Sequence, residues 1–303
     1  MPDYDVLGLG AIALDDLLYL EHFPEADTKM PVLDSVRQGG GLTATALVAV
    51  ARLGGRAAYA GLLGTDSLSR EAIEGLEAEG VDCEHVQRRE GAGPVKAVVL
   101  IDRTSGSRTI LYDSRHFGIR DPQSVDDALL ARTRVFFLDG RIASAGVVLA
   151  ARARRLGIPV VADVERLIDE GVQDMMALSD HLIVGQRLAE QVTGESDPAR
   201  ACEALWRDNR TAAIVTAGER GSWYRTAGQP VRHQPIFPVE VVDTTGCGDV
   251  YHGAYALQLA RGEPVEACVR YAAAVAALKA TRPGGRTGIP SHEGVRALLA
   301  ERD

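Results

Sequence analysis

Short apolar runs alternate with longer amphipathic or alanine-rich segments along most of the chain. The apolar runs have the length of strands, and the segments after them have helical spacing. The pairs are Ala57–Leu62 with Ser67–Glu79, Val135–Leu138 with Ala143–Leu156, and His181–Val184 with Gln186–Thr193; further strands are expected at Val6–Leu9, Pro159–Ala162 and Ala212–Thr216. This alternation predicts βαβ units and a mostly parallel sheet covered by helices.

Four β-leaning segments stand outside this alternation. They are Leu17–Leu20, Val32–Arg37, Val95–Ile101 and Arg108–Tyr112, with Thr104–Ser107 as a hairpin turn between the last two. We expect them to form a small β-rich layer added to the α/β body. The last third is predicted to be mostly helical, at Val250–Ala260, Val265–Thr281 and from Ser291 onward. No repeat or low-complexity linker divides the chain.

Composition narrows the class of protein. The chain has 303 residues, 46% of them hydrophobic and 5% aromatic, which suits a large aliphatic core. Its 33 basic and 42 acidic residues give a net charge of −9, and no run of five Lys or Arg occurs, so we expect no nucleic-acid partner. No apolar stretch of ~20 residues predicts a membrane span. No secretory signal is recognisable and the 4 cysteines lack CxxC spacing, so we expect a cytoplasmic protein without a zinc site.

The segment Gly8–Ala13 matches the G-x-G-x-x-A dinucleotide pattern and raises the hypothesis of an NAD-dependent dehydrogenase. That pattern needs a following helix and an acidic residue ~20 positions later, whereas Asp15, Asp16 and a β-leaning run follow here. Glycines that end a buried strand are the better interpretation. Asp15 itself stands just beyond that strand, where it could accept hydrogen bonds from sugar hydroxyls or simply occupy a solvated turn.

Two glycine-rich turns precede predicted helices. Gly39–Gly41 leads into Leu42–Leu53 and is either a flexible turn or a place where backbone approaches a ligand. The stronger signal is DTTGCGD at 243–249, followed by an apolar helix. Its glycines would leave amides facing an anion, and Asp249 would place a proton acceptor beside them, as phosphoryl transfer requires. An Asp helix cap explains less of this pattern, and no GxxxxGK[ST] P-loop occurs.

With these motifs the chain resembles the ribokinase, or PfkB, family of sugar kinases. DTTGCGD is similar to the family's C-terminal signature, and Gly40-Gly41 with the helix ending ARLG is similar to its N-terminal one. The resemblance implies one ATP-dependent kinase domain over residues 1–303, with a doubly wound sheet and a β-sheet lid from about 16–38 and 95–113. It also implies Mg²⁺, a monovalent-cation site for K⁺, and a homodimer formed through the lid.

The resemblance assigns roles to individual positions. Asp249 falls on the catalytic base, and Gly246, Cys247 and Gly248 fall on the anion hole. The sugar site corresponds to Asp15, Gly40, Gly41 and Thr45, the nucleotide side to Thr216, Gly218 and Gly221, and a monovalent-cation site to Asp243 and Thr245. Thr45 stands where many members have Asn. The family's N-x-x-E motif reads Gly185-Gln186-Arg187-Leu188 here, so Mg²⁺ ligands would come mostly from ATP and water.

Several stretches, among them VVDTTGCGDVYHGA, are most similar to members that phosphorylate sulfofructose, a fructose that carries a sulfonate. Lys29 and Arg141 fall on the cationic positions for that sulfonate, while Leu111 replaces an expected Asn. We therefore expect an ATP-dependent kinase for an acidic ketohexose. A kinase for another neutral or modified sugar, or a sugar-binding sensor without turnover, are the alternatives.

Overall fold

The computed structural model describes residues 2–105, 107–168 and 171–302. Within them, a main sheet of nine strands runs in the order β15-β14-β13-β12-β11-β10-β1-β4-β6. The seven strands from β13 to β6 are parallel, and β14 and β15 add an antiparallel edge. The strands are β1 (Tyr4–Leu9), β4 (Ala57–Tyr59), β6 (Val81–Asp82), β10 (Thr133–Asp139), β11 (Val160–Val164), β12 (His181–Gly185), β13 (Ala212–Thr216), β14 (Ser222–Thr226) and β15 (Arg232–Gln234).

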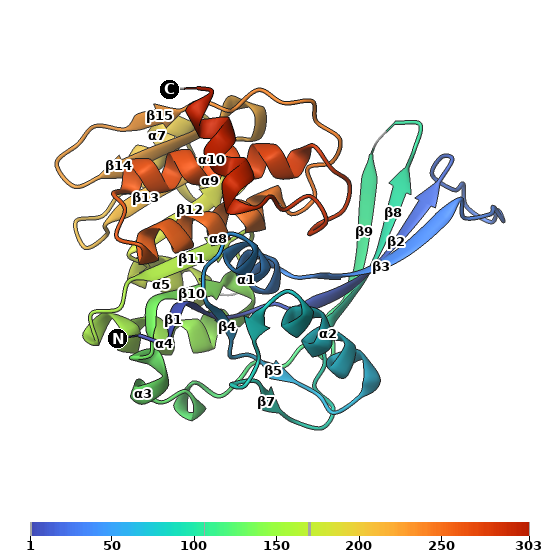
Figure 1. Cartoon of the computed structure of the whole chain (residues 1–303), viewed down its shortest axis with the longest axis horizontal. Coiled ribbons are helices and arrows are strands. Elements are labelled where there is room, and N and C mark those ends of the chain that lie inside the picture. The colour runs from blue at the N-terminus through green and yellow to red at the C-terminus, as the bar shows by residue number, and fades with distance from the viewer. Residues whose placement is uncertain (1, 106, 169–170, 303) are drawn as a thin grey trace.

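Helices cover both faces of the main sheet and create two hydrophobic cores (Figure 1). One core contains residues of α1 (Leu42–Arg52), α2 (Ser67–Ala78), α8 (Cys247–Ala260), α9 (Val265–Ala280) and α10 (His292–Ala300). The other contains residues of α3 (Asp127–Leu130), α4 (Ala143–Arg155), α5 (Gly171–Leu178), α6 (Gln186–Thr193) and α7 (Pro198–Ala204). The continuous apolar runs of the strands supply both cores, because successive side chains point to opposite faces: Phe136 enters one core and Phe137 the other.

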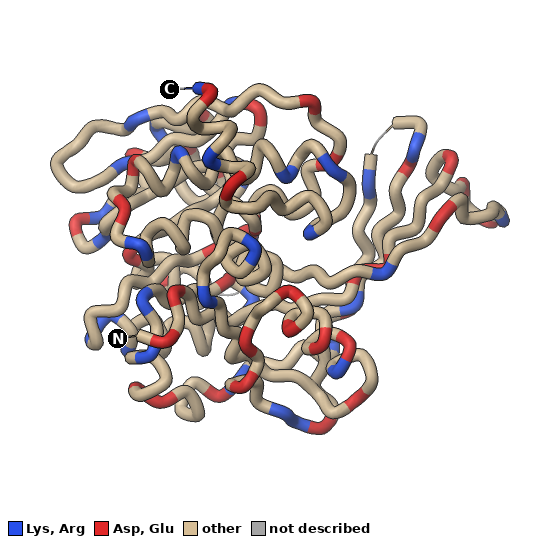
Figure 2. Tube along the Cα trace, viewed as in Figure 1, with Lys and Arg blue, Asp and Glu red and all other residues tan. Residues whose placement is uncertain are grey.

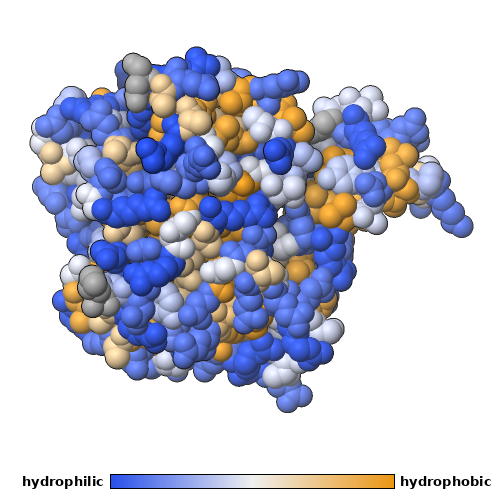
Figure 3. Space-filling model, in the orientation of Figure 1, coloured by the Kyte–Doolittle hydropathy of each residue, from blue (hydrophilic) through white to orange (hydrophobic). Residues whose placement is uncertain are grey.

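A smaller sheet of four strands projects from this body (Figure 1). Its order is β3-β2-β8-β9, with β2 (Ala13–Leu20) parallel to β8 (Val95–Asp102) and antiparallel to β3 (Asp34–Gly40), and with β9 (Arg108–Asp113) antiparallel to β8. β2 follows β1 after only residues 10–12, so the two sheets are joined directly. Hydrophobic side chains lie on the surface of this projection (Figure 3).

The predicted fold class is confirmed: a doubly wound, mostly parallel sheet carries a separate small sheet. A strand rather than a helix follows Gly8–Ala13, so the requirement of the dinucleotide pattern is not met. The segment Ala57–Leu62, predicted as one strand, is divided between β4 and a short β5 (Leu62–Leu63), which pairs with β7 (Gln87–Arg88). The predicted turn Thr104–Ser107 includes residue 106, which lies outside the described residues.

Charges of both signs are interspersed along the chain (Figure 2). Among the described residues, no helix combines the length and apolar character needed to cross a membrane.

Candidate active site

A cavity of about 540 Å³ lies where the small sheet meets the carboxyl ends of the main-sheet strands. Ligands bind at this edge in open α/β sheets because the loops that leave parallel strands gather there. The predicted site residues that line the cavity are Asp15, Gly41, Arg141, Thr245, Gly246, Gly248 and Asp249. The structure thus brings together residues from both ends of the chain.

The turn before α8 has the shape expected of an anion-binding site. Gly246 has a φ of 74°, and a Cβ there would lie 2.6 Å from the main-chain oxygen of Gly285, so only glycine fits. The amides of Gly246 and Gly248 have no hydrogen-bond partner among the described residues. Cys247 differs, because its amide donates to Thr244 O at 3.2 Å. The free amides therefore flank Cys247, at the positive end of the α8 dipole.

Asp249 lies in the first turn of α8 and faces the cavity. Burial raises the pKa of its carboxyl well above the usual range, and the neighbouring carboxylates of Asp163 and Glu165 raise it further. Asp163 is the next-to-last residue of β11, and Glu165 directly follows that strand. A buried carboxyl group with a raised pKa thus stands beside the free amides of the turn.

Asp15 lies on β2 against the turn that begins α1. A Cβ at Gly40 would approach its carboxylate to 2.1 Å, which explains why glycine is needed there. Burial raises the pKa of Asp15 to about 6, while the charge of Arg286 opposes this shift. Arg286 is only 7% exposed; its Nη2 donates to Gly40 O at 2.8 Å and its Nε to the Thr45 hydroxyl at 3.3 Å. Thr45 is consequently buried behind the cavity wall rather than on it.

Arg141 enters the cavity from the turn after β10. Its guanidinium lies 4.8 Å from the centre of the Tyr112 ring on β9 and forms no ion pair with any described residue. Asp139 positions the backbone here, because its carboxylate accepts from the amides of Arg141 at 2.9 Å and Ala11 at 2.6 Å. Arg141 is therefore a fixed cation that is available to a ligand.

Two other positions linked to sulfonate binding lie away from this cavity. Lys29 is exposed in the loop that joins β2 and β3 at the outer tip of the small sheet (Figure 1). Leu111 alternates with the cavity residues Ile110 and Tyr112 along β9, so it points to the opposite face of the small sheet and is 57% exposed. Within one chain, neither residue joins Arg141.

The predicted nucleotide residues stand at the carboxyl end of the next strands. Thr216 ends β13 and pairs in register with Gly185 on β12. Gly218 begins a short 3₁₀ turn, and Gly221 closes it. None of the three lines the 540 Å³ cavity, but all lie on the same edge of the main sheet.

The candidate cation residues are already engaged. The Asp243 carboxylate accepts from the amides of Thr245 and Gly284, each at 2.8 Å, and its main-chain oxygen accepts from the buried Lys279 ammonium at 2.9 Å. Among the described residues, no group of three or more His, Cys, Asp or Glu side chains could enclose a metal ion. Within the described part of the chain the side chains therefore form no Mg²⁺ cage, and a Mg²⁺ ion bound there would depend on ATP phosphates and water.

Arg286, Asp139, Glu165 and Arg108 were not singled out from the sequence as site residues. Arg108 on β9 reaches the loop before α8, with Nη1 3.3 Å from the Thr244 hydroxyl. The signal for Arg286 was its place in the glycine-rich stretch TRPGGRTG. The others carry no local pattern, because only folding brings them to the cavity.

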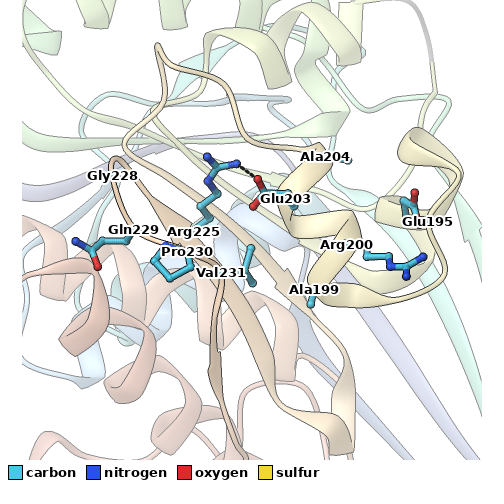
Figure 4. Close-up of a pocket in the computed structure, with 10 residues that line it drawn as sticks. All are labelled: Glu195, Ala199, Arg200, Glu203, Ala204, Arg225, Gly228, Gln229, Pro230 and Val231. Carbon is cyan, nitrogen blue, oxygen red and sulfur yellow. Dashed lines mark hydrogen bonds and ion pairs between the residues drawn. The ribbon is translucent and has the colours of Figure 1, made fainter.

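A second hollow of about 800 Å³ lies between α7 and the β14–β15 turn (Figure 4). Arg225 and Glu203 form an ion pair inside it, which leaves neither charge free for a ligand. No predicted site residue lines it.

Comparison with known proteins agrees with this geometry. Residues 6–292 match the model of the pfkB family of carbohydrate kinases. The chain is 26% identical to a ribokinase of Schizosaccharomyces pombe, covering 83% of each protein, and 27% identical to an ATP-dependent ribose-1-phosphate kinase of Halopiger xanaduensis, covering 98% of each. The crystal structure of a putative ribokinase from Agrobacterium tumefaciens superposes with a TM-score of 0.90 at 28% identity, covering 99% of this chain and 98% of that one.

The chain therefore belongs to the pfkB family of carbohydrate kinases. It is an ATP-dependent sugar kinase.

Proposed function

We propose that this kinase transfers the γ-phosphoryl group of ATP to a hydroxyl of a ketohexose that carries an acidic group, such as sulfofructose. The observation that supports an acidic group on the substrate is the position of Arg141. Its guanidinium lines the same cavity as Asp249 and forms no ion pair with the described residues. Arg binds an oxyanion through two N–H groups, and the cation–π contact with Tyr112 holds it in place. The Halopiger relative is named as an ATP-dependent ribose-1-phosphate kinase, and the sugar in that name also carries an anionic group.

In this mechanism Asp15 accepts hydrogen bonds from sugar hydroxyls and orients the sugar against Gly40 and Gly41. Asp249 takes the proton from the attacking hydroxyl, whose oxygen then forms the bond to the γ-phosphorus of ATP. The bond from that phosphorus to the bridging oxygen breaks, and ADP leaves. The free amides of Gly246 and Gly248 stabilise the charge on the transferring group.

ATP would extend from this turn toward Thr216, Gly218 and Gly221, which lie on the same sheet edge. Mg²⁺ supplies charge neutralisation on the ATP phosphates when it is bound. We propose Asp243 and Thr245 as the monovalent-cation site. Two amides already donate to the Asp243 carboxylate and the Lys279 ammonium to its main-chain oxygen, so a bound cation would have to compete with these contacts.

We also propose that the chain is one kinase domain in which the small sheet acts as the lid, and that two lids associate in a homodimer. The face of the lid away from the cavity carries an apolar group, in which Leu18 lies opposite Leu100 and Val98 opposite Leu111, next to the Asp16–Arg37 ion pair. An apolar sheet face of this kind favours a covering partner. Because Lys29 lies outside the cavity of its own chain, it would contact a sugar only in the cavity of the second copy of the dimer. A cytoplasmic location remains our expectation.

The test is a phosphorylation screen with ATP over ribose, fructose and sulfofructose. We expect the highest kcat/KM for sulfofructose. Arg141→Ala should raise its KM tenfold or more, about the 1.5 to 3 kcal/mol of a charged hydrogen bond, and should leave the KM for fructose unchanged. Arg103→Ala is the matched control, because Arg103 lies over the Tyr19 ring in the same sheet but outside the cavity. A wild-type preference for fructose, or an equal rise of both KM values in Arg141→Ala, would contradict the acidic substrate and favour a kinase for neutral sugars.

A further inference from the structure

His252 follows Asp249 by one helical turn on α8 and lies beneath the cavity floor, only 4% exposed. Its two ring nitrogens face three oxygens. Nδ1 is 2.7 Å from Gly248 O, while Nε2 is 3.2 Å from Ile183 O and 3.4 Å from Asp163 Oδ1. Both ring nitrogens thus point at groups that can only accept hydrogen bonds or carry negative charge.

This arrangement suits a doubly protonated imidazole. A neutral ring carries a proton on one nitrogen only, so the other nitrogen would direct its lone pair at an oxygen. Asp163 provides the second reason. It is 2% exposed, and its Oδ2 has no hydrogen-bond partner in the described structure. Burial and the neighbouring carboxylates of Glu165 and Asp139 raise the pKa of Asp163 well above the usual range. An ionised Asp163 with so few partners therefore requires a cation that faces it.

Charged groups converge on Asp249 from several elements. Asp163 and Glu165 approach from β11 and the chain after it, and Asp139 from β10. Three basic residues oppose the negative charge of these carboxyl groups: His252 on α8 itself, Lys279 from α9 and Arg286 from the loop before α10. The Cys247 thiol is also near Asp249. Lys279 is bound to Asp243 O and Arg286 to Gly40 O and Thr45. Of these three basic residues, His252 is therefore the one that also contacts a carboxyl group of the acidic cluster, that of Asp163.

We propose that His252 is a positioning residue for the phosphoryl-transfer step: as an imidazolium paired with Asp163, it keeps Asp249 ionised among the surrounding carboxylates. This inference rests on the proposed role of Asp249 as the base. Without the imidazolium, the carboxyl groups of Asp163, Glu165 and Asp139 would surround that of Asp249 unopposed by it, and Asp249 would favour its protonated form more strongly. A protonated Asp249 could not accept the proton of the sugar hydroxyl.

The first experiment is the pH profile of kcat/KM for His252→Gln, with ATP and the best sugar of the screen. Glutamine keeps a hydrogen-bonding group but no charge. We expect the acid limb of the profile, where kcat/KM falls as the pH decreases, to move to higher pH by about one unit. Relative to the wild type, kcat/KM should then be lowered roughly tenfold more at pH 6 than at pH 8.5. His181→Gln is the matched control: His181 is equally buried and bonded to the Tyr255 hydroxyl at 2.7 Å, but burial lowers its pKa to about 4, so it is neutral. It should lose stability without moving the limb.

The second experiment follows the ring directly by ¹⁵N NMR of the wild-type protein, with the His252→Gln spectrum to assign the signal. We expect imidazolium shifts at pH 7.5 that Asp163→Asn converts to those of a neutral ring. A neutral His252 in the wild type, or an acid limb that does not move in an active His252→Gln enzyme, overturns the proposal. Absence of turnover with every sugar would instead count against the proposed function, and the NMR result would still decide the state of His252.

Discussion

The guanidinium of Arg286 donates a 2.8 Å hydrogen bond to the main-chain oxygen of Gly40. This bond joins the loop before the last helix to the turn that begins the first one, and the same arginine faces Asp15. The sugar side of the cavity is thus held by a residue from the other end of the chain.

Arg286→Leu should raise the KM for the sugar tenfold or more, because the turn at Gly40 loses its donor and Asp15 loses its facing cation. Breaking one side of a buried charged contact should also lower the free energy of unfolding by about 3 kcal/mol. Steady-state kinetics and urea unfolding measure the two effects. Arg282→Gln, an exposed arginine in the same loop, should leave both unchanged. An unaltered KM in Arg286→Leu would remove Arg286 from sugar binding.

Asp249→Asn should lower kcat by ~10² or more, since a positioned base contributes about that much, and should change the KM for sugar and ATP only a few-fold. Asp197→Asn, at the cap of the distant α7, is the control for a lost carboxylate. Turnover of Asp249→Asn near the wild-type rate would assign the base to another group.

Sugar binding should depend on pH through Asp15. Because its pKa is raised to about 6, the carboxylate is ionised above pH 6 and protonated below. If the ionised form accepts the sugar's hydrogen bonds, the sugar Kd should be constant near pH 8 and rise about tenfold per pH unit below pH 6. Calorimetric titration from pH 5 to 8 measures this dependence. Asp15→Asn should bind weakly with no such slope; a slope retained in that variant would point to another group.

Leu111→Asp should convert the proposed dimer into a monomer at micromolar concentration. The substitution places a charge on the apolar outer face of the small sheet and leaves the cavity face, with Ile110 and Tyr112, intact. Sedimentation equilibrium distinguishes the two states. A wild-type protein that sediments as a monomer would contradict the dimer without affecting the proposed chemistry.

The hydrophobic pattern predicts the fold well where burial is complete. Strand β13, Ala212–Thr216, has the predicted bounds because parallel strands buried on both faces read as unbroken apolar runs. The edge strands β14 and β15 were not predicted, because their polar, partly exposed sequences carry no such signal. Glycine-rich turns likewise indicated Gly41 and Gly246, whereas Glu165 and Arg108 depend on long-range packing that no local pattern records.

The direct passage from β1 into β2 has a mechanical consequence. Asp15 lies on β2, which only residues 10–12 separate from β1 in the main sheet, so the proposed lid would act as a lever hinged at these residues. A swing of that lever that uncovers the cavity also carries Asp15 away from the phosphoryl-transfer turn at Gly246. Sugar binding by Asp15 and closure of the proposed lid would therefore be one movement, whereas ATP, which we propose to bind toward Gly218 and Gly221, would not contact the lid.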